Sequence, residues 1–201
     1  MKFIREASED EMILEFLRGE IKSERFQAQI MEVLKSQKES VEIIINADLN
    51  NSNENLKRKE ILSIFRGYGS NTELFENFPN ISKWIFTECT DEDINKIHYI
   101  NYSYWNELSK YTGLPLVAAE TIREDREIYN ISNSGFISGV NYLEEGGVFP
   151  PIILLTSTNE NYLILEGHSR MTVYGLAPSF FEGTNCYIGI CEERELSKWN
   201  S

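Results

Sequence analysis

The sequence predicts an α/β (α+β) protein in which a helical N-terminal portion packs on a small sheet formed by the C-terminal part of the chain. Three observations carry this prediction. Residues 1–40 show the spacing of amphipathic helices, and residues 149–201 alternate short apolar runs with helical patterns. In addition, 41% of the 201 residues are hydrophobic and 12% are aromatic, which is enough for a sizeable core and excludes a disordered chain.

Residues 1–40 predict two helices. Apolar residues recur at one-, three- and four-residue steps in residues 12–17 and again in residues 26–34. Ser8, followed three residues later by Glu11, is typical of a capping box at a helix start. The apolar stripes favour a core-facing role over a groove for a partner.

The next segment mixes strand and helix signals. "VEIIINADL" (residues 41–49) is dense in β-branched residues and predicts a strand, whereas "NNSNEN" (residues 50–55) predicts a polar loop. Helical spacing resumes in residues 56–65, and we expect that helix to end at Gly67 and Gly69.

The middle of the chain is rich in aromatic residues. "LFENFP" (residues 74–79) and "SKWIF" (residues 82–86) carry them without regular spacing, so we expect irregular structure there. Residues 99–105 place four aromatic side chains within seven positions. "LVAAETI" (residues 116–122) predicts either a short strand or the start of a helix.

A boundary between two regions of the chain is expected near residues 112–116, where the residue pattern of the sequence changes. It divides a mainly helical region (residues 1–113) from a second region (residues 114–201). No Pro/Ser-rich linker marks the boundary, so a seam inside one compact unit stays open as an alternative.

The C-terminal region reads as a series of short elements. "ISNSGFISGVNYLEEGG" predicts a weak helix in residues 131–147. "FPPIILLTS" (residues 149–157) and "YLILEG" (residues 162–167) predict two antiparallel strands joined by a turn at residues 158–161. The expected continuation is a helix in residues 169–177, a strand in residues 185–191 and a closing helix in residues 192–199.

Composition narrows the classes of partner. The formal net charge of −13 repels a phosphate backbone, so binding to nucleic acid is disfavoured, although a local basic pocket could still hold one nucleotide. The sequence contains no run of about 18 apolar residues, so no membrane span is predicted. The chain starts without the apolar core of a signal peptide, so the expected location is the cytoplasm.

The three cysteines do not indicate a disulfide framework. Cys89, Cys186 and Cys191 lack CxxC spacing, and we interpret them as small buried apolar residues in a reducing compartment. Cys186 and Cys191 flank one predicted strand five residues apart, which puts them on opposite faces. With His98 and His168 as the only histidines, no metal site is predicted.

The junction after the second C-terminal strand carries the strongest chemical signal. Gly167 lets backbone approach a ligand closely, and the helix that follows offers free N–H groups and the positive end of its dipole. His168, Ser169 and Arg170 add side-chain donors, and an arginine can form a bidentate hydrogen bond with a phosphate. The alternative is an ordinary turn with Ser169 as a cap and Arg170 solvated.

The stretch "FPPIILLTSTNENYLILEGHSRMTVYGL" resembles the core of the ParB/sulfiredoxin superfamily. Shared features are two prolines before a strand, a short hairpin, a strand that ends in an acidic residue and glycine, and an apolar helix. The resemblance covers about residues 114–192. It implies a small mixed sheet in which this segment wraps the phosphates of a nucleotide.

Within that superfamily, "EGHSR" (residues 166–170) is most similar to the acid-Gly-His-His-Arg of the ADP-dependent serine kinase branch. Ser169 stands where that branch has its second histidine. Sulfiredoxins need a nucleophilic cysteine directly after the glycine, and this chain has His168, which argues against sulfinic-acid reduction. A single arginine at the junction argues against chromosome partitioning.

The resemblance implies a nucleotide- or phosphate-ligand-binding protein, which could be an Mg²⁺-dependent phosphotransferase or nucleotide hydrolase. Glu120 lies roughly where kinase-like members have an acidic residue, and Glu166 adjoins the phosphate site. A non-catalytic interaction or regulatory module with a protein partner is the alternative, and a ParB-like nuclease is the third. The implied cofactor is ATP, ADP or CTP with Mg²⁺; the implied cofactor-binding residues are Gly167, His168, Ser169 and Arg170; the implied catalytic residues are Glu120, Glu166 and His168.

Two further segments have a functional and a structural interpretation. Arg66 in "FRGYGSN" would reach a shared cleft if the N-terminal helices pack over the C-terminal core, or it is a solvated arginine at a helix end. The aromatic residues of "YINYSYWNEL" (residues 99–108) could stack a base or substrate ring, or they belong to the core.

Overall fold

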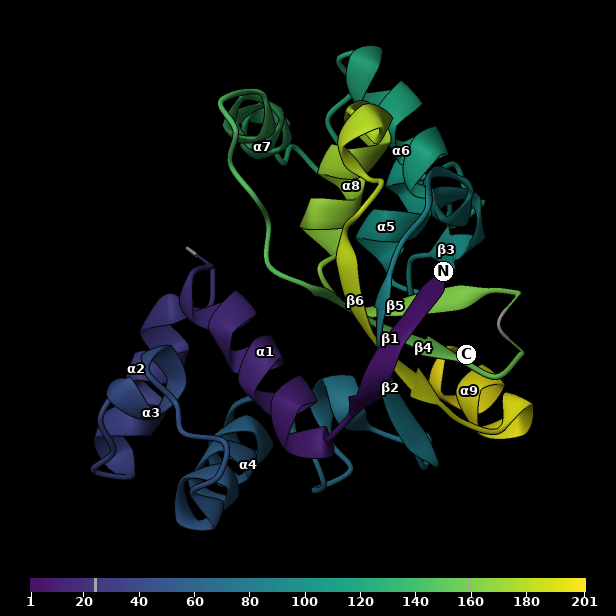
Figure 1. Ribbon diagram of the computed structural model, residues 1–201. Helices are drawn as coiled ribbons and strands as arrows, with labels where there is room; N and C mark the ends of the chain where they lie inside the picture. The colour runs from purple at the N-terminus through teal and green to yellow at the C-terminus, as the bar shows by residue number, and fades with distance from the viewer. Residues whose placement is uncertain (24, 159) are drawn as a thin grey trace.

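A single mixed sheet forms the centre of the molecule (Figure 1). The structure, a computed structural model, describes residues 1–23, 25–158 and 160–201. Within these residues the strand order across the sheet is β1-β2-β6-β4-β5-β3. The strands are β1 (Lys2–Ala7), β2 (Lys83–Glu88), β3 (Ile97–His98), β4 (Ile152–Thr156), β5 (Tyr162–Glu166) and β6 (Asn185–Ile190).

Both strand orientations occur in this sheet. β1 and β2, β2 and β6, and β4 and β5 pair antiparallel, whereas β4 pairs parallel with β6 and β3 pairs parallel with β5. The prediction of a hairpin formed by β4 and β5 is therefore confirmed. Its turn, predicted at residues 158–161, includes residue 159, which lies outside the described residues.

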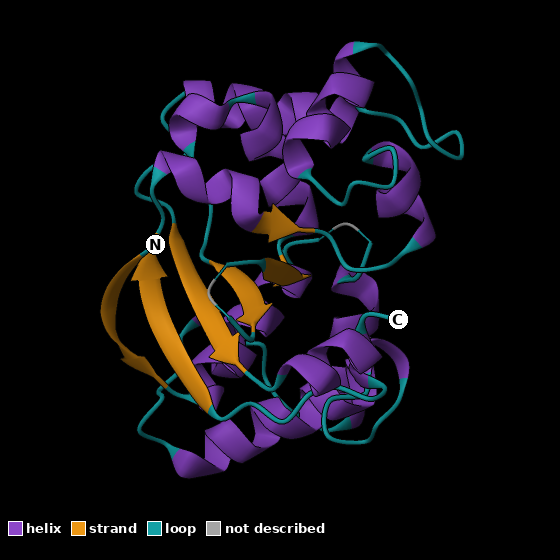
Figure 2. Cartoon of the chain, turned by 90° about the vertical axis from the view of Figure 1, so that its right-hand side faces the viewer, coloured by secondary structure: helices purple, strands orange, loops and turns teal. Residues whose placement is uncertain are grey.

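Helices cover both faces of the sheet (Figures 1 and 2). One face packs against α1 (Glu9–Ile21), α2 (Gln27–Ser36), α3 (Glu42–Ile45), α4 (Ser52–Arg66) and α9 (Glu193–Trp199). The other packs against α5 (Ser103–Leu108), α6 (Pro115–Arg123), α7 (Ser134–Glu144) and α8 (His168–Leu176). Short 3₁₀ helices are η1 (Glu73–Phe75), η2 (Asp91–Lys96) and η3 (Pro178–Phe180).

Strand β4 shows how the two cores share one sheet. Ile153 and Leu155 point into the core formed with α1 and α4, whereas Ile152 and Leu154 point into the core formed with α6 and α8. Every residue of β4 is buried, as expected for a strand covered on both faces. The predicted α/β class is therefore confirmed.

Local signals for helix ends are also confirmed. Glu11 N–H donates to Ser8 Oγ (3.2 Å) and Ser8 N–H donates to Glu11 Oε2 (2.8 Å), which completes the predicted capping box of α1. Gly67 ends α4 in the left-handed conformation, with φ of 85°. Cys186 and Cys191 lie in different cores, on opposite faces of the sheet as predicted.

The predicted strand at residues 41–49 is wrong, because this segment contains the short helix α3. Two arginines satisfy its carbonyl groups in place of a neighbouring strand. Arg18 Nε donates to Ile44 O (3.0 Å), and the fully buried Arg58 donates from Nη1 to Ile43 O (2.7 Å). The β-branched run buries Ile44 in the core without forming a sheet edge.

Several boundaries also differ from the prediction. Residues 2–7, which precede the helix start predicted at Ser8 and for which no strand is predicted, form β1, and "SKWIF", expected to be irregular, supplies most of β2. Their strand character comes from pairing across a long sequence distance, with Phe3 opposite Thr87. Residues 52–55 belong to α4, which Asn51 caps by accepting from Glu54 N–H (3.3 Å).

The sheet takes strands from both predicted regions. β1, β2 and β3 precede the boundary expected at residues 112–116, and β4, β5 and β6 follow it. The open alternative at residues 116–122 is settled as helix α6, with Pro115 in its first turn. Among the described residues, no helix combines the length and apolar character needed to cross a membrane.

Candidate functional site

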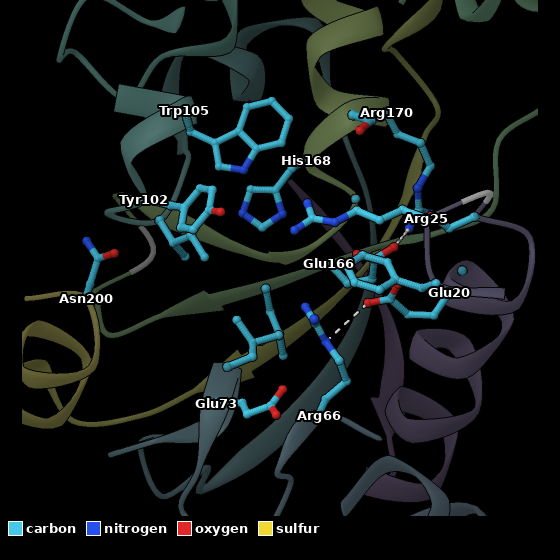
Figure 3. A pocket seen from close by; sticks show the side chains of 18 of the residues that line it. Glu20, Arg25, Arg66, Glu73, Tyr102, Trp105, Glu166, His168, Arg170 and Asn200 are labelled. Carbon is cyan, nitrogen blue, oxygen red and sulfur yellow. Dashed lines mark hydrogen bonds and ion pairs between the residues drawn. The ribbon is translucent and has the colours of Figure 1, made fainter. Parts of the chain in front are cut away.

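A cavity of about 1130 Å³ opens between the N-terminal helices and the β5–α8 junction (Figure 3). The end of α1, the end of α4, the segment before α5 and the C-terminal residues all contribute walls. Residues far apart in the sequence therefore meet at one place. The lining residues that matter below are Glu20, Arg25, Arg66, Tyr102, Trp105 and the junction residues 166–170.

The junction itself is built around Gly167. Its φ of 107° lies in the left-handed region, and a Cβ there would be 3.0 Å from Ile152 Cγ2. Helix α8 starts at His168 without a side-chain cap, and its first helical bond runs from Met171 N–H to Gly167 O (2.9 Å). The N–H groups of residues 168–170 thus lack helical acceptors and lie at the cavity wall, at the positive end of the helix dipole.

Arg170 is held in place by protein acceptors. Its Nη1 donates to Pro150 O (2.7 Å) and to Pro151 O, and its Nη2 donates to Glu166 Oε1 (2.9 Å). The side chain is 12% exposed. This guanidinium therefore ties the two prolines before β4 to the end of β5, and a phosphate would compete with three existing acceptors for it.

A second carboxyl group faces Glu166 from the N-terminal side. Glu20, at the end of α1, is 3% exposed, and its Oε1 lies 3.4 Å from Arg66 Nε. The helix comes so close that a Cβ on Gly19 would be 2.7 Å from Glu166 Oε1. Burial, reinforced by the nearby Glu166 carboxylate, raises the pKa of Glu20 to about 8. Glu20 therefore keeps its proton near neutral pH and does not repel the Glu166 carboxylate.

His168 forms part of an aromatic wall. Its ring stacks on Trp105 (ring centroids 5.3 Å apart, 18° between planes), and Tyr99 stacks on Trp105 at 4.8 Å. Within the described residues His168 Nε2 is buried and makes no hydrogen bond. Burial, together with the positive charges of Arg66 and Arg170, lowers the pKa of His168 to about 3. The imidazole is therefore neutral and has a ring nitrogen left for a ligand.

Two arginines from the N-terminal half also line the cavity. The Arg66 guanidinium lies 4.6 Å from the centroid of the Phe26 ring, and the Arg25 guanidinium lies 4.8 Å from the same ring. Arg66 Nε is at ion-pair distance from Glu20 but is not aligned for a hydrogen bond with it. Two arginines are thus stacked on one phenylalanine at the cavity wall.

The structure brings together most of the site residues predicted from the sequence. Glu166, Gly167, His168, Ser169 and Arg170 all line the cavity. Glu120 does not: it is exposed on α6, a helix whose other face packs against α8. Residues 116–122 form part of helix α6, and Glu120 lies on the exposed side of that helix, outside the cavity.

Some of the remaining cavity residues could be predicted from the sequence and others could not. Arg66 reaches the cavity, which the cleft-forming interpretation of "FRGYGSN" requires, and Tyr102 and Trp105 belong to the dense aromatic segment. Glu20 and Arg25 were not predicted. Nothing in their local sequence distinguishes them from the charged residues of any solvent-exposed helix end, because only the packing of α1 against β5 brings them to the site.

Known proteins and metal-binding patterns add no assignment to this geometry. Comparisons found no matching family model, no matching curated protein and no matching solved structure. Across residues 1–23, 25–158 and 160–201, no group of three or more His, Cys, Asp or Glu side chains is arranged to hold a metal ion. The ParB/sulfiredoxin resemblance therefore stays a prediction from the sequence.

Proposed function

We propose that the protein binds a small phosphate-bearing ligand in this cavity, with the phosphate at the N-terminus of α8. The observation that carries the proposal is the uncapped start of α8, where the N–H groups of residues 168–170 border an open cavity. Helix N-termini of this kind favour anions through their free donors and their dipole. The site needs no broad basic surface, so the acidity of the chain does not oppose it.

Additional donors surround the same point. Ser169 is exposed at the cavity wall, and the neutral His168 has a free ring nitrogen there. Arg25 and Arg66 provide positive charge at the cavity wall, because the Arg170 guanidinium is already hydrogen-bonded within the turn. In this proposal Arg170 positions the turn, and Ser169, His168 and Arg66 are the candidate phosphate contacts.

A nucleotide is the ligand class that best fits the whole cavity. Its volume of about 1130 Å³ is at the large end of small-molecule sites, and Tyr102 offers a half-exposed aromatic face on which a ring could stack. ATP, ADP or CTP with Mg²⁺ is therefore the first set to test. A magnesium ion held by phosphates needs only one or two carboxylates from the protein, and Glu166 is the closest candidate.

Phosphotransfer or nucleotide hydrolysis is the enzymatic form of this proposal. It would draw on Glu166 and His168, whereas Glu120 lies outside the cavity. Since Glu166 already pairs with Arg170 at 2.9 Å, the geometry equally suits a module that binds the ligand without turnover. We keep the non-catalytic module as the second candidate for this reason.

Calorimetric titration with ATP, ADP, CTP and GTP, each with and without Mg²⁺, tests the proposal. The informative variant is Ser169→Asp, because a carboxylate at a helix start stabilises the helix but repels a phosphate there. Ser52→Asp, an exposed first-turn position of α4 outside the cavity, is the matched control. We expect Ser169→Asp to weaken binding at least tenfold and Ser52→Asp to leave it unchanged.

Two results would overturn the proposal. One is that no nucleotide or pyrophosphate binds the wild type at millimolar concentration. The other is that a ligand binds both aspartate variants as tightly as the wild type, which would place its phosphate away from α8. Release of phosphate or transfer to an acceptor, measured on the same samples, separates the enzyme from the module.

A further inference from the structure

Two of the three cysteines lie side by side inside the molecule. Cys89 Sγ and Cys186 Sγ are 3.0 Å apart, about one ångström beyond the bond length of a disulfide, which is about 2.05 Å. Both are free thiols, and each is at most 1% exposed. They come from positions 97 residues apart, so their proximity is a property of the fold.

The pairing of β2 with β6 creates this proximity. Thr87 stands opposite Cys186 in the ladder, and Cys89 continues the ladder one step past the end of β2, where its N–H donates to Thr184 O (2.8 Å). Side chains two residues apart share a face, so Cys89 and Thr87 point the same way. Cys89 is therefore a diagonal neighbour of Cys186 on the face that packs against α8.

The third cysteine provides an internal contrast. Cys191 lies in the other core, on the face that packs against α1, and its Sγ contacts Thr156 O at 3.6 Å. The sheet separates it from the Cys89–Cys186 pair. Any reaction that needs two adjacent thiols is thus open to Cys89 and Cys186 and closed to Cys191.

We propose that Cys89 and Cys186 form a modification site, a thiol pair that closes to an intramolecular disulfide when the protein meets a peroxide. One thiolate attacks a peroxide oxygen, the O–O bond breaks, and a sulfenic acid forms as the first water leaves. The second thiol then attacks that sulfur, the S–O bond breaks and the second water leaves. The sulfurs lose two electrons and two protons in total, and hydrogen peroxide is reduced to two waters.

The position of the pair controls how it reacts. Burial raises the pKa of the Cys186 thiol, so little thiolate is present and the folded interior protects the pair. Cys89 follows the last residue of β2 and Cys186 is the second residue of β6, so the route we propose for a small oxidant is local separation of these strand ends. The disulfide would tie β2, from the N-terminal part of the chain, to β6, from the C-terminal part.

Alkylation after peroxide treatment tests this inference, which does not depend on the ligand proposal. The native protein is incubated with hydrogen peroxide, quenched with acid, denatured and alkylated. We expect the wild type to take up one alkyl group instead of three, and peptide mapping to find a bond between Cys89 and Cys186. Cys191→Ala should still form the bond, whereas Cys89→Ala and Cys186→Ala should not.

The melting temperature supplies a second measurement that does not depend on the Cys89→Ala and Cys186→Ala variants. Closing the loop should raise the melting temperature of the wild type and of Cys191→Ala, and dithiothreitol should reverse the rise. The proposal is overturned if three alkyl groups are still incorporated after peroxide treatment of folded protein. It is also overturned if oxidation yields only sulfinic or sulfonic acids, or disulfides between two chains.

Discussion

Arg170 and Arg66 line the same cavity but have different surroundings. Arg170, from the motif that the sequence singles out, gives its guanidinium to Pro150, Pro151 and Glu166. Arg66, from the end of α4, lies over the Phe26 ring with its Nε free of hydrogen bonds among the described residues. An arginine in the predicted motif therefore serves to build the turn, while an arginine without such hydrogen bonds reaches the cavity from another part of the chain.

Replacing the two arginines in turn tests that comparison most strongly. Arg170→Ala should lower the free energy of unfolding by about 3 kcal/mol, because it removes charged hydrogen bonds and leaves the Glu166 carboxylate without its partner. Arg66→Ala should cost no more than about 1 kcal/mol, since it loses a ring contact and a 3.4 Å contact with the protonated Glu20 that is not aligned for a hydrogen bond. Urea denaturation of both variants checks this. Equal losses would remove the distinction between them.

Two glycines with positive φ, Gly167 at the cavity and Gly69 outside it, extend the comparison to the backbone. Gly167→Ala should cost about 2 kcal/mol, because left-handed strain adds to contacts with Ile152 at 3.0 Å and with Arg170. Gly69, with φ of 74°, has no atom of the described residues within 4 Å of an added Cβ. Gly69→Ala should therefore cost only about 1 kcal/mol, the backbone strain alone. Thermal and urea unfolding of both variants measures the difference.

Glu20 should give the stability of the protein a characteristic pH dependence. Burial and the Glu166 charge raise its pKa from 4.5 to about 8, although Arg66, Arg25 and Arg170 also face it and act in the opposite direction. Between these pH values the folded state holds a proton that the unfolded state has released, so stability falls as the pH rises from about 4.5 to about 8.

Glu20→Gln tests this dependence directly. The variant should lose the decline in stability, and its gain over the wild type at pH 8 should reach at least about 1.4 kcal/mol, the equivalent of one pKa unit. Glu76→Gln, an exposed carboxylate on the same cavity, is the control and should follow the wild-type curve. Urea denaturation from pH 5 to pH 9 measures all three proteins. A Glu20→Gln curve parallel to the wild type would show that Glu20 is ionised throughout.

Ser169→Ala should have the smallest effect on the free energy of unfolding and a measurable effect on ligand affinity. Its exposed hydroxyl makes no hydrogen bond within the described part of the chain, so the free energy of unfolding should change by less than about 0.5 kcal/mol. Loss of one hydrogen bond worth about 1 kcal/mol should weaken binding about fivefold. Titration of the nucleotide that binds the wild type best measures the change. A large loss of stability would instead make Ser169 part of the turn, like Arg170.

The elements predicted correctly share one property, which is that their signals lie within a few residues. The capping box of Ser8 and Glu11 and the end of α4 at Gly67 depend on nearby backbone alone. The order β4, β5, α8, β6, α9 follows from short runs with clear periodicity. The junction residues 166–170 were found for the same reason, because glycine and donors at a strand-to-helix turn are visible locally.

The elements that were missed or predicted wrongly depend on distant partners. Residues 2–7 become a strand because β2 supplies hydrogen bonds, and residues 41–49 fail to become one because Arg18 and Arg58 take their carbonyl groups. Both outcomes follow the rule that buried backbone groups must be paired, but the identity of the pairing group is set by packing.

The sequence by itself determined the α/β class, the position of the glycine that opens α8 and the chemical character of that junction. Only the tertiary structure decided which charged groups line the cavity. The packing of α1 brings Glu20 and Arg25 to it, whereas the Arg170 guanidinium is hydrogen-bonded to Pro150 and Glu166. The physical reason is the distance along the chain over which each effect acts. Helix periodicity and backbone conformation act over a few residues, whereas hydrogen-bond saturation and burial depend on which distant segments come into contact.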